Sequence, residues 1–230
     1  MKKKLFVLGA IFCIFNSQVF AYELESTKNE LRQKNISEIG FNILNANRID
    51  HRVVFYYDYS NKSRNAFARS ADKAVTIQKG LVPFLDSDDE YAAILCHEIA
   101  HQMDFYEGGP FIGLAMTFQP KKYEKKADKR AVDFMVKAGY NPLALIVVMN
   151  KSFGQLVTDF GGTHPLVSKR LAYVYEYIYR KYPAYLAHNA YKNNLYYQNF
   201  LLTSRKNRTL LEAALKREEE SNKIIKINYK

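Results

Sequence analysis

Few cysteines and no long apolar run occur in this sequence, and both absences narrow the classes of protein it can be. Its 230 residues include only Cys13 and Cys96. If the N-terminal segment is removed, Cys96 is the one remaining thiol, so no intramolecular disulfide can form even in an oxidising compartment. The apolar run from Leu5 to Phe15 has roughly half of the about 20 residues that a membrane-spanning helix needs. Stability must therefore come mainly from packing, and a chain that is 48% hydrophobic can form one substantial core.

The N-terminus has the pattern of a cleaved secretory signal. Lysines at positions 2–4 precede the apolar run, and a small residue, Ala21, follows it, as expected near a cleavage site. We therefore expect a signal peptide over residues 1–21, no transmembrane span after its cleavage, and an exported protein. A periplasmic location fits best and secretion is the alternative. A lipid anchor on Cys13 is disfavoured because Phe12, which is not small, precedes it.

No recognisable nucleic-acid motif is present, although the chain is basic. The formal net charge is +11, and removal of the three N-terminal lysines leaves +8. The basic residues are scattered among acidic ones, which is not the clustered pattern of a nucleic-acid-binding face. We expect no nucleic-acid partner; for an exported protein, anionic surfaces or acidic partners fit the charge better.

Residue patterns predict a mostly helical α+β fold. Three short segments rich in aromatic or β-branched residues predict a small three-stranded sheet: residues 52–58, 65–69 and 74–78. Capping boxes predict that helices begin at Thr27, Ser87 and Thr209. The second of these helices carries acidic residues in its first turn and stops at Gly108.

The segment LCHEIAH, residues 95–101, lies in the middle of the second of these helices. Residues four apart lie one above the other on a helix, so the imidazoles of His97 and His101 can converge on one metal ion. Glu98 lies one position round the helix, from which it can reach a water held by the metal, as a general base does. The alternative is two structural histidines, but the apolar residues around them would then leave two buried polar groups in need of partners.

A third ligand is needed, and an acidic pair downstream offers one. Glu124 and Asp128 are four apart on a predicted helix that ends at Gly139. Glu124 would complete the two-histidine, one-glutamate set of a catalytic zinc, with one zinc ion per chain. Asp128 could accept a hydrogen bond from the far nitrogen of a ligand histidine and fix its tautomer. Taken alone, an acidic pair among lysines is more often a solvated helix face.

Three longer stretches carry a family resemblance, within about residues 30–180. They read NAFARSADKAVTIQKGLVPFLDSDDEYAAILCHEIAH, EKKADKRAVDFMVKAGYNPLAL and THPLVSKR. In this order they resemble the zinc metallopeptidase (gluzincin) family of HtpX, the CaaX prenyl protease and BepA-like periplasmic proteases. The resemblance implies a compact domain with a small sheet beside the zinc helix. It implies these site residues: His97, His101 and Glu124 as ligands, Glu98 as catalytic base and Asp128 as support for a ligand.

Together with the N-terminal pattern and the composition of the tail, the resemblance divides the chain into three expected parts. These are a signal peptide at 1–21, a zinc metallopeptidase domain at 22–183 and a C-terminal helical appendage at 184–230. The appendage is too short for the three or more helical repeats that such arrays need. For it we favour a helix packed on the core followed by a solvated, charged helix, with a docking surface as the alternative.

The same resemblance indicates further site residues. It places the segment around His164 over the metal cleft, where the imidazole would be a fourth ligand that keeps the protease latent or a stabiliser of the oxyanion; the alternative is an exposed loop histidine. From its position about a turn and a half into the predicted helix that follows His164, Arg170 could pair with an acid near the site and pin this segment, with a solvated arginine as the alternative. An edge strand that binds extended substrate implies contacts at Asn65, Ala66 and Phe67, although Phe67 packing in the core is an equal alternative.

Two apolar patches remain, at residues 109–118 and 143–149. Both are too short to cross a bilayer, so each is expected to be a buried helix or a flexible lid, with shallow membrane contact as the alternative.

Two functions stay open at this point. The favoured one is an exported endopeptidase that hydrolyses unfolded or misassembled polypeptide substrates, in which Glu98 takes a proton from the attacking water and passes it to the leaving amine. Envelope assembly machinery is a candidate partner. The alternative is a latent or non-catalytic zinc-binding chaperone or assembly factor.

Overall fold

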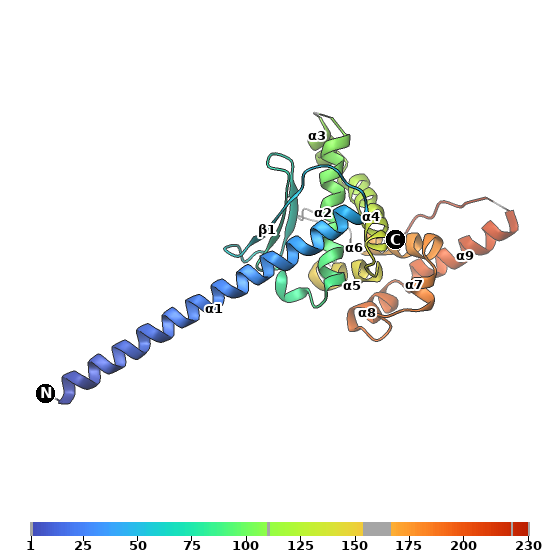
Figure 1. Cartoon of the computed structure of the whole chain (residues 1–230). Coiled ribbons are helices and arrows are strands. Elements are labelled where there is room, and N and C mark those ends of the chain that lie inside the picture. The colour runs from blue at the N-terminus through green and yellow to red at the C-terminus, as the bar shows by residue number, and fades with distance from the viewer. Residues whose placement is uncertain (1, 110, 154–166, 222, 230) are drawn as a thin grey trace.

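The computed structural model describes residues 2–109, 111–153, 167–221 and 223–229, with side chains from residue 23 onward except at 153 and 167. The fold is α+β and mostly helical, which confirms the predicted class (Figure 1). The elements in chain order are α1 (Lys2–Ala46), β1 (Val54–Asp58), β2 (Ala66–Arg69), β3 (Ala74–Gln78), the short 3-10 helix η1 (Val82–Phe84), α2 (Asp88–Glu107), α3 (Ile112–Phe118), α4 (Pro120–Lys137), α5 (Leu143–Phe153), α6 (Val167–Lys181), α7 (Ala184–Ala187), α8 (Leu195–Thr203) and α9 (Arg205–Ser221).

Helix α1 is continuous, and its C-terminal part packs against the core. Ile36, Ile39 and Ile43 are buried, whereas the N-terminal part of α1 runs away from the other elements (Figure 1). The predicted helix start at Thr27 is wrong. The Thr27 hydroxyl donates to the Glu23 carbonyl one turn back, which places it inside a continuing helix and not at a cap.

A second predicted helix start is wrong for the same reason. Helix α9 begins at Arg205, and the Thr209 hydroxyl donates to the Arg205 carbonyl. A threonine and a glutamate three residues apart therefore do not mark a helix start when the preceding residues are themselves helical.

The three predicted strands are confirmed, and they form one mixed sheet in the order β1-β3-β2. β1 pairs with β3 in parallel, and β2 pairs with β3 antiparallel. The central strand β3 is buried along its whole length, while β2 lies at one edge. The Asn65 carbonyl accepts from the Gln78 amide at 3.1 Å. In an antiparallel pair every second residue is hydrogen-bonded to the neighbouring strand, so Asn65, Phe67 and Arg69 face β3 with their backbone groups. The backbone groups of Ala66 and Ala68 therefore point away from β3.

Helix α2 lies at the centre of the fold and packs against β2, β3, α4 and α5. It starts as predicted, because the Ser87 side chain caps it by accepting from the Glu90 amide at 3.3 Å. The Glu90 carboxylate accepts from the Asp86 amide at 3.0 Å, one residue before the partner that a regular capping box uses. The α2 side chains from Glu90 to Asp104 are all buried, so whatever α2 carries in its middle is held rigidly inside the molecule.

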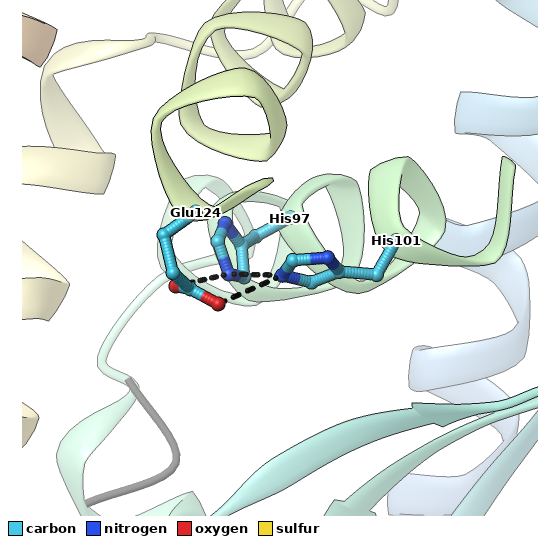
Figure 2. Close-up of side chains that lie close together, drawn as sticks. All are labelled: His97, His101 and Glu124. Atoms are coloured by element: carbon cyan, nitrogen blue, oxygen red, sulfur yellow. Dashed lines mark hydrogen bonds and ion pairs between the residues drawn. The ribbon is translucent and has the colours of Figure 1, made fainter. Parts of the chain in front are cut away.

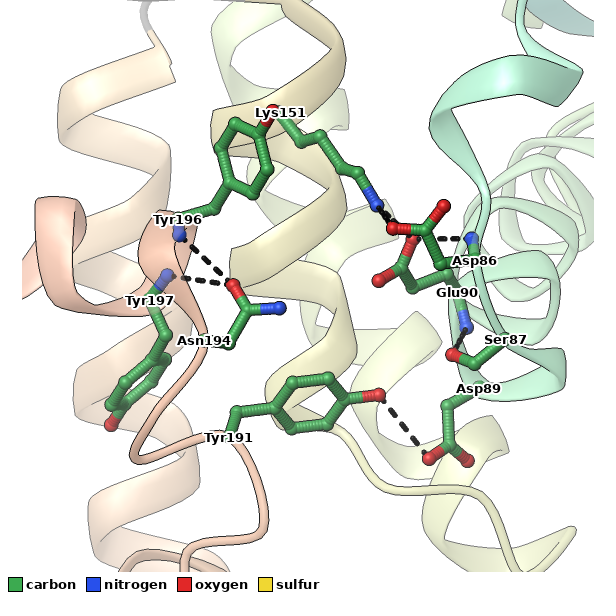
Figure 3. A network of polar contacts seen from close by, with 9 residues as sticks. All are labelled: Asp86, Ser87, Asp89, Glu90, Lys151, Tyr191, Asn194, Tyr196 and Tyr197. Carbon is green, nitrogen blue, oxygen red and sulfur yellow. Dashed lines mark hydrogen bonds and ion pairs between the residues drawn. The ribbon is translucent and has the colours of Figure 1, made fainter.

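A polar network ties the start of α2 to the second half of the chain (Figure 3). Lys151, at the end of α5 with a side chain only 5% exposed, makes ion pairs with Asp86 and with Glu90, the latter at 2.9 Å. The Tyr191 hydroxyl donates to the Asp89 carboxylate at 3.3 Å. A buried lysine needs such partners, because an unpaired buried charge is costly.

The C-terminal helices pack on this core in two ways. In α8, Tyr197 and Phe200 are buried in the main hydrophobic cluster. In α9, Leu211 and Ala214 form a separate cluster with Tyr229 and with Ala172 of α6. The packed helix that we expected here is α8, whereas α9 is charged but buries one side.

The two apolar patches differ from one another. Residues 143–149 form the buried part of α5, as expected. Residues 112–118 form α3, which has no buried residue, so the expectation of a buried helix is wrong there. Among the described residues, no helix has the length and apolar character needed to cross a membrane.

Candidate metal centre and cleft

Two histidines of α2 and one glutamate of α4 converge at the centre of the molecule (Figure 2). His97 and His101 lie on the same face of α2, and their Nε2 atoms are 3.1 Å apart. The Glu124 carboxylate faces both rings: its Oε2 is 3.4 Å from His97 Nε2 and its Oε1 is 3.2 Å from His101 Nε2. All three residues are buried, and they form a group that could hold a metal ion.

The donor set and spacing of this triad fit a zinc ion. Four ligands around a tetrahedral zinc with bonds of about 2.0 to 2.1 Å are about 3.3 Å from one another. The three distances within the triad lie between 3.1 and 3.4 Å. Two imidazoles and one carboxylate are also the ligands of a catalytic site, in which one position stays open.

Asp128 and Arg170 surround the triad and fix its orientation. His97 Nδ1 lies 3.1 Å from Asp128 Oδ1, so the opposite nitrogen faces Glu124. The Arg170 guanidinium contacts both carboxylates, with Nε donating to Asp128 at 2.8 Å and Nη1 lying 2.7 Å from Glu124 Oε2. Of the two alternatives for Arg170, the structure shows the pairing with acids near the site.

The charged groups in this cluster strongly shift one another's pKa values. Burial lowers the pKa of His97, but hydrogen bonds to Asp128 and Glu124 outweigh burial and raise it to about 10. Burial raises the pKa of Asp128, but Arg170 and His97 outweigh burial and lower it to about 2. In the metal-free chain the carboxylates therefore hold a positive charge on His97, which shows that the surroundings favour a cation at this place.

Helix α4 is fixed against α2 by a second group of ion pairs. The side chain of Asp104 is fully buried and contacts Lys126 Nζ and Arg130 Nη1, the latter at 3.2 Å. Arg130 also contacts Glu107 through both Nη atoms. Lys126 and Arg130, two of the basic residues that make α4 resemble a solvated helix in the sequence, thus hold α4 against α2, the helix that carries the two histidines.

Two residues of the triad, His101 and Glu124, face a cleft of about 530 Å³. Glu98 and His101 lie in its wall beside Glu124, and Glu98 is only 4% exposed. Strand β2 contributes Phe67 and Ala68 to the opposite side. A buried carboxylate beside the candidate metal centre can act as a general base, and an edge strand along the same cleft can bind an extended polypeptide.

The structure brings some of the predicted residues to the cleft and not others. Of Asn65, Ala66 and Phe67, which are all described, only Phe67 lines the cleft. The side chain of Ala66 is buried. His164 lies outside the described residues.

Several residues of the cleft were missed by the sequence reasoning. They come from β2, α2, α3 and α4: Ala68, Phe105, Gly113, Met116, Thr117, Pro120 and Tyr123. The positions of Phe105 and Tyr123 could have been predicted. Phe105 is one helical turn beyond His101, and Tyr123 directly precedes Glu124. The contribution of α3 had no signal beyond the lid alternative for residues 109–118.

Comparison with known proteins agrees with this geometry. The family model described as Peptidase family M48 matches residues 30–104 and 109–178 of the chain. The matched segments cover more than half of the 230 residues and include both histidines, Glu98, Glu124, Asp128 and Arg170. None of the curated proteins compared with the chain matches it.

Proposed function

Because the chain belongs to peptidase family M48, we propose that it is an exported zinc-dependent endopeptidase that hydrolyses peptide bonds of unfolded or misassembled proteins. Membership of the family indicates a metal-dependent peptidase with polypeptide substrates. The single observation that supports the finer proposal best is the buried group of His97, His101 and Glu124, of which His101 and Glu124 line a cleft together with Glu98.

Each residue of the group has a distinct task. His97, His101 and Glu124 would hold the zinc, which when bound acts as a Lewis acid that polarises the peptide carbonyl and makes water easier to deprotonate. Glu98 takes the proton of the attacking water and gives it to the leaving nitrogen. Asp128 holds the His97 ring in one tautomer, and Arg170 orients the two carboxylates.

The preference for unfolded substrates is supported by β2. The backbone groups of Ala66 and Ala68 point away from β3, at the edge of the sheet. An extended polypeptide can add there as a further strand, with backbone hydrogen bonds that make little demand on sequence. A folded protein does not offer a free extended segment, so this mode of binding selects unfolded chains. Phe67 then contacts substrate side chains in the cleft.

Export is supported by the N-terminal sequence pattern, and a periplasmic location follows if the host has an outer membrane. Envelope assembly machinery is a candidate partner in that compartment.

The competing function is a zinc-binding chaperone or assembly factor without turnover. The two are distinguished by incubating the zinc-loaded protein with reduced, carboxymethylated α-lactalbumin, an unfolded protein. The wild type should cleave it, and Glu98→Gln should keep the zinc and the melting temperature but lose nearly all cleavage, because a proton carrier is removed and no ligand is lost. Binding without cleavage by both proteins would favour the chaperone, and equal cleavage by both would show that the base is another residue.

A further inference from the structure

Helix α3 has two faces with different surroundings. An α-helix turns about 100° per residue, so residues 113, 116 and 117 lie on one side of α3 and residues 114 and 118 on the other, which is also the side of Phe111, the N-cap residue just before the helix. The first side lines the cleft through Gly113, Met116 and Thr117. The second side is exposed.

The outward side of α3 is strongly apolar. Phe111 is 76% exposed, Leu114 58% and Phe118 75%. Single exposed apolar residues are common, but three large ones on one face of one short helix indicate a surface that contacts something apolar. We call these three residues the outer face of α3.

The charged residues within the segment 108–123, which contains the outer face, are lysines. Lys121 and Lys122 are exposed in the first turn of α4, which follows α3 after a single residue. No acidic residue occurs between Gly108 and Tyr123. Large apolar side chains beside lysines, in a segment too short to cross a bilayer, are typical of segments that lie in the interface of an anionic membrane.

We propose that the outer face of α3 docks this protein on an anionic lipid bilayer, with Phe111, Leu114 and Phe118 in the headgroup region and Lys121 and Lys122 on the lipid charges. The proposal goes beyond the peptidase function and does not depend on it. It also has a spatial consequence: the cleft and the docking surface are opposite sides of one helix, so the cleft lies about one helix diameter, roughly 10 Å, from the lipid surface.

Two other occupants fit the outer face less well. A substrate polypeptide in the cleft contacts the opposite side of α3. A second copy of the chain would bring Lys121 and Lys122 close to their own symmetry mates in a two-fold contact, and three side chains provide far less than the about 800 Å² per partner of a standard stable interface.

The absence of tryptophan from the sequence allows a local test. Phe118→Trp introduces a single indole at the outer face, and Leu202→Trp introduces one on α8 at a residue that is 78% exposed. The purified protein carrying each change is titrated with vesicles of phosphatidylglycerol and phosphatidylethanolamine, and separately with phosphatidylcholine vesicles. A reporter at the site itself is needed because the apolar N-terminal segment, where it is retained, can bind lipid by itself.

The proposal expects a blue shift of the Phe118→Trp emission with the anionic vesicles, weakened by salt, and a smaller response to phosphatidylcholine. Leu202→Trp should not shift. In the wild-type background, Phe111→Ser with Leu114→Ser should lower the vesicle partition coefficient about tenfold or more, while Leu195→Ser with Leu202→Ser should not. Lys121→Glu with Lys122→Glu should abolish the preference for anionic lipid.

Retention of zinc and of the melting temperature shows that each variant is folded. If the Phe118→Trp emission is the same with and without anionic vesicles, the proposal is overturned. It is also overturned if that emission shifts with carboxymethylated α-lactalbumin and not with vesicles, because the outer face would then bind polypeptide.

Discussion

Replacing Arg170 with methionine should destabilise the metal-free protein much more than the zinc-loaded protein. The guanidinium of Arg170 contacts Glu124 at 2.7 Å and Asp128 at 2.6 Å, and all three side chains are at most 7% exposed. Methionine has a similar length and no charge. The change therefore leaves two buried carboxylates with His97 as their remaining cation.

The size of the effect follows from this burial. Removing one partner of a buried ion pair typically costs about 3 to 5 kcal/mol. For a chain of this length, each kcal/mol lowers the melting temperature by about 2 to 4 °C, so the metal-free variant should melt about 6 to 20 °C below the wild type. With zinc bound, the ion supplies positive charge next to Glu124. The loss should then fall to about half, because zinc compensates Glu124 for the lost guanidinium and Asp128 keeps only its contact with His97.

The assay is thermal unfolding followed by circular dichroism, in excess chelator and in excess zinc. The matched control is Arg180→Met: Arg180 contacts Glu218 through two nitrogens, at 2.6 and 2.9 Å, but its side chain is 24% exposed and lies away from the metal centre. The control should lose only a few degrees, by the same amount in both conditions. Equal shifts for the two variants in chelator, or a shift of Arg170→Met that zinc does not reduce, would refute the reasoning.

Three further changes test the rest of the site. Asp128→Asn should weaken zinc binding about 10- to 100-fold, measured by competition with a chromophoric chelator; an unchanged Kd would mean that Asp128 does not support the ligand His97. Ala66→Pro should lower kcat/KM for an unfolded substrate more than it lowers the melting temperature, because the lost N–H points away from β3; equal losses would indicate an ordinary strand. His164→Ala should raise basal proteolysis if His164 is a latch, and lower it with zinc retained if it stabilises the oxyanion. No change in rate or zinc affinity would make His164 a bystander.

The local chemistry of the site was readable in the sequence because it depends on short spacings. Two histidines four apart on a helix must share a face, and the apolar residues around His97 and His101 indicated that this face is buried. The strands were predicted correctly for the same reason, because short runs of aromatic and β-branched residues bounded by polar turns are typical of strands.

What the sequence did not show depends on contacts between distant elements. The ion pairs of Asp104 with Lys126 and Arg130 hold α4, the helix that carries Glu124, against α2. Only the packing of α4 on α2 reveals this. The position of α3 along the cleft is also a tertiary property, since its seven residues have no periodic signal strong enough to separate a buried helix from a cleft wall.

The two wrong helix starts have a simple physical cause. A threonine hydroxyl can accept from the amide three residues ahead or donate to the carbonyl four residues back, and the sequence around Thr27 and Thr209 fits both. The structure shows the second arrangement in each case. A capping box marks a helix start only where its first residue is not itself helical. Ser87 meets this condition, because its backbone is extended.

The most direct test of the proposed metal centre is the zinc content of the purified protein after dialysis against zinc, measured by mass spectrometry of the metal. The account predicts one zinc per chain in the wild type and in Glu98→Gln, and almost none in His101→Ala, which loses a ligand. A wild type without zinc, or a His101→Ala variant that retains one zinc per chain, would contradict it.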